Sequence, residues 1–275
     1  MAWHEVGDRV FTRHFDFFDQ QIGVVLGGRD VLVVDTRSTP AQAREILADL
    51  RELTRDPVSV VVNTHWHFDH TFGNSVLRPA AIWGHVHAAA QLRREGEAAR
   101  REVAEGAPTL AADLAEVVID PPEHTFDERA TIRLGDRVVE LSYHGRAHTD
   151  GDIAVLVPDA GVLFAGDLIE EGSPPSFGDS FPLDWPATLE RLLPLATGAV
   201  VPGHGAISDR AFVAEQLRAF RSIVDLARQV HEGALSIEAA IAASPFGPRT
   251  PRDAFERALA QLRGELARDE PEATR

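Results

Sequence analysis

Short apolar runs recur along the chain, and most of them are too short to be buried helices. We predict strands over residues 22–26, 31–34, 58–62, 80–83, 131–134, 138–141, 153–157, 162–165 and 199–201. Glycine-containing turns separate the runs at 22–34 and those at 131–141, which is typical of β-hairpins.

Apolar residues at helical spacing appear between and after these runs. Pro40 opens an amphipathic pattern that continues to Leu53, and residues 87–118 are rich in Ala, Arg and Glu, with a break near 106–108. Further helices are predicted over residues 187–195, after Ser208 and over 254–268, followed by a polar tail at 269–275 that we expect to be disordered. The order of strands and helices favours a mixed layered architecture over a doubly wound parallel sheet.

The charge balance excludes several classes of partner. All 27 basic residues are arginines and 43 residues are acidic, which gives a formal net charge of −16. Nucleic acids and anionic membranes attract basic surfaces, so neither is expected as a partner. The chain has no cysteine and no lysine, which excludes disulfides, thiolate ligands and Schiff-base lysines.

The N-terminal segment does not resemble a targeting signal. Glu5 and Asp8 stand where a signal peptide needs an apolar run. No stretch reaches the length of about 20 apolar residues that spans a membrane. We therefore expect a cytoplasmic protein.

Residues 64–70, Thr-His-Trp-His-Phe-Asp-His, place four potential metal ligands directly after the predicted strand at 58–62. In an extended segment His65 and His67 project to the same side, so both imidazoles can reach one ion. Asp69 and His70 follow the bend and can turn toward a second ion. Such a density of ligand types favours a metal site over separate surface or core roles.

Three further candidates each follow a predicted strand. His148 lies in Gly-Arg-Ala-His-Thr-Asp-Gly-Asp, Asp167 in Leu-Phe-Ala-Gly-Asp, and His204 in Val-Pro-Gly-His-Gly. Taken singly, either histidine is more typical of a capping or core residue. Loops at one end of a sheet converge in space, so we expect all three to join the first cluster.

The motifs H-x-H-x-D-H, H-T-x-G-D, A-G-D and G-H-G, in this order, resemble those of the metallo-β-lactamase-fold superfamily. The resemblance implies an α+β fold, a four-layer αββα sandwich with the metals at one edge. Only helical patterns remain past residue 235, so we expect a catalytic domain over 1–235 and a helical C-terminal extension with its tail over 236–275. The implied ligands are His65, His67 and His148 for one ion, Asp69, His70 and His204 for a second, and Asp167 as the bridge.

Two divalent ions about 3.5–4 Å apart can share a water and make a metal-bridging hydroxide available at neutral pH. We therefore predict a metal-dependent hydrolase of an ester, thioester, lactone or amide bond in a small molecule. Asp69 is the expected catalytic residue, orienting the nucleophile and passing a proton to the leaving group. Nitrogen and carboxylate ligands suit Zn²⁺, Fe²⁺ or Mn²⁺, of which Zn²⁺ is expected.

Asp167 also narrows the branch of the superfamily. True β-lactamases of the superfamily usually lack this bridging Asp and often carry Cys, whereas the Asp resembles the glyoxalase II and lactonase-like branch. An alternative is a mononuclear iron dioxygenase of thiol persulfides, with iron on His65, His148 and Asp167. RNA processing, which the superfamily also performs, is opposed by the acidic balance.

The C-terminal helices have two open interpretations. They either cap the substrate cleft or serve the formation of a homo-oligomer. Arg249 and Arg252 are candidates for binding an anionic substrate.

Overall fold

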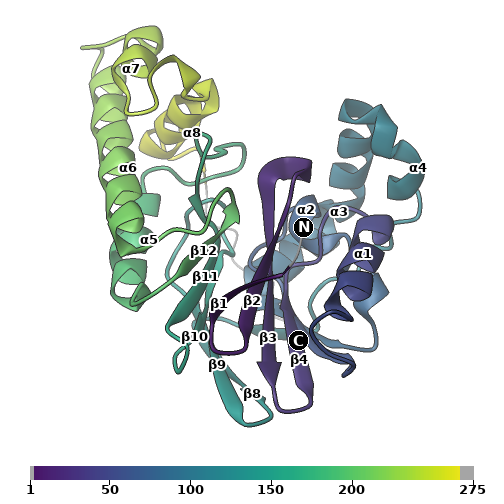
Figure 1. Ribbon diagram of the computed structural model, residues 1–275. Coiled ribbons are helices and arrows are strands. Elements are labelled where there is room, and N and C mark those ends of the chain that lie inside the picture. The colour runs from purple at the N-terminus through teal and green to yellow at the C-terminus, as the bar shows by residue number, and fades with distance from the viewer. Residues whose placement is uncertain (1–2, 267–275) are drawn as a thin grey trace, which may run out of the picture.

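One continuous sheet folds into two halves, called here the first and the second sheet, which lie face to face between outer layers of helices, as Figure 1 shows. The computed structural model describes residues 3–266. The first sheet runs in the order β7 (His124–Phe126), β6 (Ala81–His85), β5 (Val58–Val62), β4 (Asp30–Val34), β3 (Gln20–Gly27), β2 (Val10–Phe15) and β1 (His4–Gly7). The second sheet runs in the order β12 (Val200–His204), β11 (Val162–Glu170), β10 (Ile153–Val157), β9 (Arg137–Tyr143) and β8 (Arg129–Leu134). The sheets meet where His204 of β12 pairs with Gln20 of β3.

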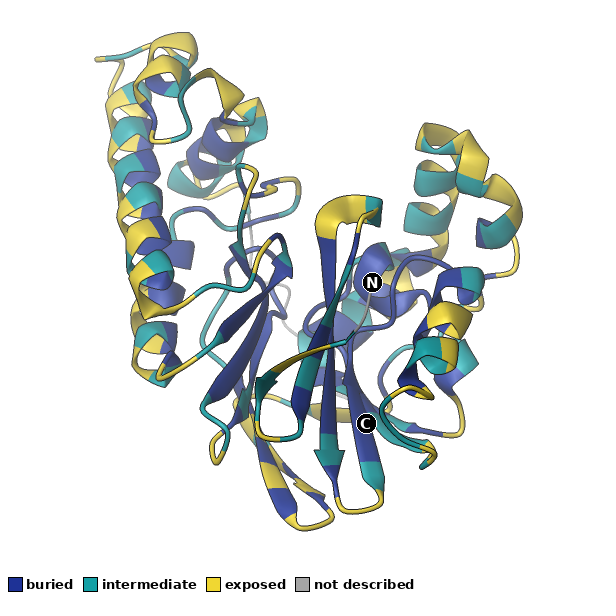
Figure 2. Cartoon of the chain, viewed as in Figure 1, coloured by how far each residue is buried: buried dark blue, intermediate teal, exposed yellow. Residues whose placement is uncertain are grey.

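Apolar side chains from both sheets fill the space between them. Leu32 and Val62 of the first sheet and Val155, Phe164 and Val201 of the second are at most 2% exposed. The central strands are buried on both faces, which is why they appear in the sequence as continuous apolar runs. Figure 2 shows the strands as largely buried, with exposed residues at the hairpin tips.

Helices form the two outer layers. On the side of the first sheet lie α1 (Pro40–Leu50), α2 (Phe68–Thr71), α3 (Val86–Gly106) and α4 (Ala111–Leu114). On the side of the second sheet lie α5 (Trp185–Leu192), α6 (Arg210–His231), α7 (Ile237–Ala243) and α8 (Arg252–Leu262). The four-layer αββα sandwich expected from the motifs is therefore confirmed.

Local signals explain where the helices begin. Thr39 caps α1, its side-chain oxygen accepting the backbone N–H of Gln42 at 3.2 Å, and Pro40 is the first helical residue. The predicted break near residues 106–108 is confirmed, because α3 ends at Gly106 and a short 3₁₀ turn begins at Pro108. The helix predicted from Pro40 to Leu53 ends earlier, at Leu50.

Two residues that we expected in loops lie within strands instead. β11 continues to Glu170 and β12 to His204, so Asp167 is inside β11 and His204 is the last residue of β12. Gly166 has a φ of 53°, and the pairing of β11 with β12 is irregular around it before resuming between Glu170 and His204. The parallel pairing thus carries β11 beyond its apolar run.

The strands β1, β2 and β7 were not expected from the sequence, because their polar residues hide the apolar alternation. The C-terminal helices share one hydrophobic cluster with the second sheet's outer layer, in which Ala240, Phe255 and Ala258 pack with Trp185 and Phe220. The division at residues 235 and 236 stays a prediction. α8 ends at Leu262, and the predicted tail at 269–275 lies outside the described residues.

Over residues 3–266, no helix combines the length and the apolarity that a membrane crossing requires.

Candidate metal centre

Four side chains converge at the edge where the two sheets meet. His65 and His67 follow β5, His148 lies in the loop between β9 and β10, and Asp167 lies in β11. Nδ1 of His67 is 3.1 Å from Nε2 of His65 and 2.8 Å from Nε2 of His148. Oδ2 of Asp167 is 3.6 Å and 3.3 Å from the Nε2 atoms of His65 and His148. Tetrahedral zinc with ligand bonds of about 2.0–2.1 Å separates its ligand atoms by about 3.3 Å, so these four atoms fit one ion.

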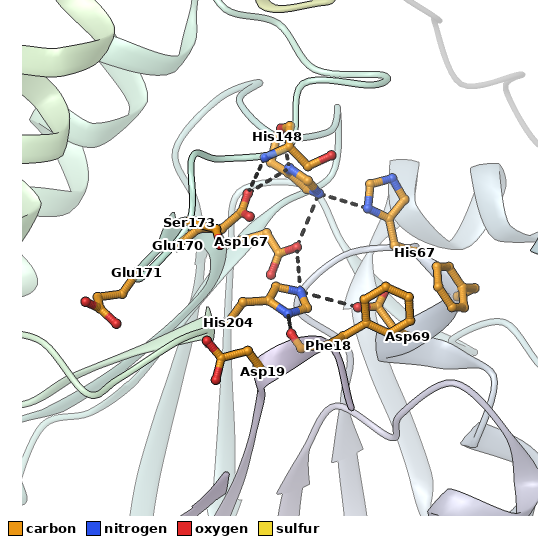
Figure 3. A pocket seen from close by; sticks show the side chains of 12 residues that line it. Phe18, Asp19, His67, Asp69, His148, Asp167, Glu170, Glu171, Ser173 and His204 are labelled. Atoms are coloured by element: carbon orange, nitrogen blue, oxygen red, sulfur yellow. Dashed lines mark hydrogen bonds and ion pairs between the residues drawn. The ribbon is translucent and has the colours of Figure 1, made fainter. Parts of the chain in front are cut away.

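A second set of ligands lies directly beside the first. Asp69 and His70 are on α2, and His204 is at the end of β12. Nε2 of His204 is 3.3 Å from Nε2 of His70 and 3.3 Å from Oδ2 of Asp69. Asp167 reaches this set too, with Oδ1 3.4 Å from Nε2 of His70 and Oδ2 3.3 Å from Nε2 of His204. The carboxylate of Asp167 therefore lies between the two sets, and Figure 3 shows it between His148 and His204.

All seven predicted ligands are thus brought together, in one group of four and one of three whose ligand atoms lie within 4.8 Å of one another. Oδ1 of Asp167 is buried without a hydrogen-bond partner in the described part of the chain. Buried carboxylate oxygens normally have a partner, so this atom fits a bound cation. The donor types, distances and burial all fit divalent metal ions.

Each of the five imidazoles also has a polar contact at its other ring nitrogen, the one that faces away from the ligand sets. The outward pairs are His65 Nδ1 with Thr64 Oγ1 (3.1 Å), His67 Nε2 with Asp179 Oδ1 (2.9 Å), His148 Nδ1 with the Ser176 carbonyl (3.2 Å), His70 Nδ1 with Asp35 Oδ2 (2.8 Å) and His204 Nδ1 with the Phe18 carbonyl (2.6 Å). Such contacts fix the ring orientation and direct the other nitrogen toward a metal.

The two carboxylates among these outer partners, Asp35 and Asp179, were not identified from the sequence. Asp35 accepts the backbone N–H and the hydroxyl of Thr64, both at 2.8 Å, in addition to contacting His70. Asp35 directly follows β4. The observation that pointed to Asp167 and His204, a His or Asp after a predicted strand, therefore also points to Asp35. Asp179 lies in the long segment between β11 and α5, where no spacing pattern marks it.

The C-terminal helix α8 holds the segment that carries Asp179. Arg257 donates to the carbonyls of Asp179 at 2.7 Å and Ser180 at 2.9 Å. Gln261 accepts the backbone N–H of Leu183 at 2.8 Å. A helix far along the chain thus positions the partner of His67.

Burial and neighbouring charges shift the pKa values of the site in opposite directions. Burial lowers the pKa of His67, but the charge and hydrogen bond of Asp179, together with the charges of Asp69 and Asp167, outweigh it and raise the pKa to about 9. Burial lowers the pKa of His148 to about 4, which keeps this imidazole neutral. Burial and then the charge of Asp167 raise the pKa of Glu170 to about 8. The metal-free site therefore holds protons that a bound cation displaces.

A cleft with a volume of about 410 Å³ opens over these ligands, as Figure 3 shows. Phe18 and Phe68 form its apolar side, and Glu170, Glu171 and Ser173 form the opposite side. Phe18 is 50% exposed, and its ring contacts that of Phe68. The cleft is of a size that binds small molecules.

The part of the sequence that carries this site matches a known protein family. The sequence profile of the family described as "Metallo-beta-lactamase superfamily" matches residues 16–204. This chain is a member of the metallo-beta-lactamase superfamily. All seven ligand candidates lie inside the matched segment, whereas α6, α7 and α8 lie beyond it.

Curated relatives of this superfamily include enzymes with different substrates. The chain is 26% identical over 188 residues to a metallo-beta-lactamase type 2 of Bacteroides fragilis, covering 66% of this chain and 67% of the relative. It is 28% identical over 232 residues to the human acyl-coenzyme A thioesterase MBLAC2, covering 74% and 80% of the two chains. The predicted class of a metallo-beta-lactamase superfamily hydrolase is confirmed at this level.

A solved metallo-beta-lactamase from Pontibacter korlensis has the same fold, with a TM-score of 0.64 and 21% identity. The likeness covers 80% of this chain and 98% of that one. The assignment to a glyoxalase II and lactonase-like branch rests on Asp167 and stays a prediction.

The pair of His67 and Asp179 predicts a pH dependence of the metal-free protein. The pKa of His67 is raised from 6.5 to about 9, so protonated His67 stabilises the folded state fully below pH 6.5. That stabilisation is lost as the pH rises through about 9. Thermal melting of chelator-treated protein over this range measures the loss, and Asp179→Asn should flatten it. Identical profiles for the wild type and the variant would contradict this role, because other histidines titrate in both.

The backbone of β12 at Gly203 lies close to Asp167, which predicts that adding a side chain there weakens metal binding. A Cβ built on Gly203 would lie 1.8 Å from Oδ1 of Asp167, so Gly203→Ala must displace the bridging carboxylate. We expect zinc affinity to fall by about ten-fold or more, measured by competition with a chromophoric chelator. Gly178→Ala is the matched control, because no heavy atom lies within 4 Å of its added Cβ. Equal affinities of the two variants would refute the prediction.

Proposed function

We propose that this chain is a dinuclear metal-dependent hydrolase of small molecules that carry an ester, thioester, lactone or amide bond. The observation that carries the proposal is the junction of two ligand sets at one carboxylate, Asp167, whose two oxygens contact His70 on one side and His65 and His148 on the other. Zinc is the proposed metal, because the ligand atoms of the first set are separated by distances close to those of tetrahedral zinc.

When bound, two divalent ions polarise a substrate carbonyl and lower the pKa of a water so that it attacks at neutral pH. The side chains of the cleft perform the other tasks. In the metal-free protein the charges and hydrogen bonds of His70 and His204 together outweigh burial and hold the pKa of Asp69 well below its usual range, so its carboxylate is ionised. Since Oδ2 of Asp69 contacts both histidines, we assign Oδ1 to accept the nucleophile's proton and return it to the leaving group. Phe18 and Phe68 exclude water from one side of the substrate.

The second ligand set favours two ions over one. A mononuclear iron dioxygenase needs only His65, His148 and Asp167, and it leaves the set of Asp69, His70 and His204 without a use. The net charge of −16 also opposes an RNA substrate. The relatives support two bond classes, a thioester through the human thioesterase and a lactam through the bacterial enzyme.

A substrate panel tests the proposal. Zinc-loaded protein is incubated with p-nitrophenyl acetate, an acyl N-acetylcysteamine thioester, an acyl homoserine lactone and nitrocefin. We expect hydrolysis of at least one, abolished by a chelator and restored by zinc. No hydrolysis of any compound, together with oxygen uptake by iron-loaded protein and glutathione persulfide, would overturn the proposal in favour of the dioxygenase.

The role of Asp69 gives a sharper prediction. Asp69→Asn should lower kcat at saturating zinc by about 10²–10⁴-fold, because the amide cannot accept the proton. Asp19→Asn is the matched control, since Asp19 lines the same cleft but contacts His14 rather than the ligand sets. Metal content and melting temperature are measured alongside, to separate chemistry from metal loss. Turnover of Asp69→Asn within two-fold of the control would remove Asp69 from the mechanism.

A further inference from the structure

A second cavity opens directly beside the metal cleft. It has a volume of about 560 Å³ and shares three lining residues with the cleft, Glu170, Glu171 and Ser173. In Figure 3 these residues lie on the opposite side of Asp167 from His67. The cavity therefore extends the cleft away from His67, toward the C-terminal helices.

The far wall of this cavity comes from a part of the chain beyond the family match. Phe212 and Ala219 on α6 and Pro245 and Phe246, between α7 and η5 (Gly247–Arg249), supply apolar surface. An apolar cavity next to the reaction site accommodates the non-reacting part of a substrate.

Two arginines stand on the same wall. Arg218 on α6 and Arg249 on η5 line the cavity, and neither side chain has an ion-pair or hydrogen-bond partner among residues 3–266. Arg252, the other cation considered from the sequence, lies outside the cavity lining and is bound by Glu238 at 2.9 Å and Glu256 at 2.8 Å. The structure thus distinguishes the two arginines: Arg249 lines the cavity, whereas Arg252 is paired with glutamates outside it.

Acidic residues also line the cavity, but two of the three are engaged. Glu170 accepts the backbone N–H of Ser176 at 3.0 Å, and Glu171 accepts that of Ala206 at 2.8 Å. The third, Glu215, is exposed on α6, and within residues 3–266 it forms no ion pair or hydrogen bond with Arg218 or Arg249. The guanidinium groups of Arg218 and Arg249 are therefore exposed hydrogen-bond donors that no residue among 3–266 engages.

We propose that this cavity binds the distal end of the substrate, where Arg218 and Arg249 bind a carboxylate or phosphate joined by an apolar segment to the bond that is cleaved. The proposal rests on the proposed function and specifies its substrate class. Arginine binds both anions through parallel hydrogen bonds, and Phe212 and Phe246 cover the connecting segment.

Ligand binding tests the proposal without requiring turnover. Straight-chain dicarboxylates from succinate to sebacate are compared by calorimetry with monocarboxylates of the same length, on zinc-loaded protein. A parallel series with a terminal phosphonate in place of the distal carboxylate identifies the preferred anion. We expect at least one doubly anionic ligand to bind more tightly than its singly anionic partner.

Arginine variants show whether this preference comes from the cavity. Arg218→Gln and Arg249→Gln should each lower the affinity for the preferred ligand by about three- to five-fold, as expected for partly exposed ion pairs. Neither variant should change the affinity for the monocarboxylate. Arg252→Gln removes the same charge nearby and should leave both affinities unchanged.

Two results would overturn the proposal. One is the absence of any preference for a second anion at every length, including the absence of binding. The other is an equal loss in Arg252→Gln and Arg249→Gln, which would indicate a general charge effect. A failure of the proposed function would be distinguishable, because it would appear as absent hydrolysis while the arginine-dependent preference persists.

Discussion

Four imidazoles, those of His65, His70, His148 and His204, lie within 3.6 Å of the carboxylate of Asp167. A buried carboxylate is costly to desolvate unless cations or donors compensate it, so this carboxylate needs the positive charge that surrounds it. Protons on neighbouring imidazoles supply that charge in the metal-free protein, and divalent ions fit the same positions. The local backbone is shaped for this carboxylate, since Gly203 allows β12 to approach it and Gly166 turns β11 beside Thr64.

The fold positions this group by bringing separate strands to one edge. The inner ligands come from β11, from the end of β12 and from segments that follow β5 and β9, and the sheet pairing holds these positions relative to one another. The outer contacts come from elsewhere, including the carbonyl of Phe18 and the carboxylate of Asp179. Through Arg257, the C-terminal helix α8 supports Asp179 and hence His67. The C-terminal helices therefore contribute to the metal site as well as to the second cavity.

Much of the centre could be predicted from the sequence because two simple signals coincide there. The segment after β5 holds several potential metal ligands close together, a spacing that is typical of metal sites. His148, Asp167 and His204 each follow an apolar run. Asp179 and Arg257 could not be predicted, because their roles depend on a contact between segments 78 residues apart. The strands β1, β2 and β7 were missed for a related reason, since their pairing partners rather than their composition make them strands. Arg249 and Arg252 look alike in the sequence, and only their packing distinguishes them.

The number of metal ions that the protein binds is the most direct test of the central role of Asp167. Protein saturated with zinc, freed of excess metal and analysed by mass spectrometry should contain two equivalents, because Asp167 joins two complete ligand sets. Asp167→Ala should lose at least one of them. A single equivalent in the wild type, unchanged by replacing His204, would contradict the account and leave the second ligand set without a metal to bind.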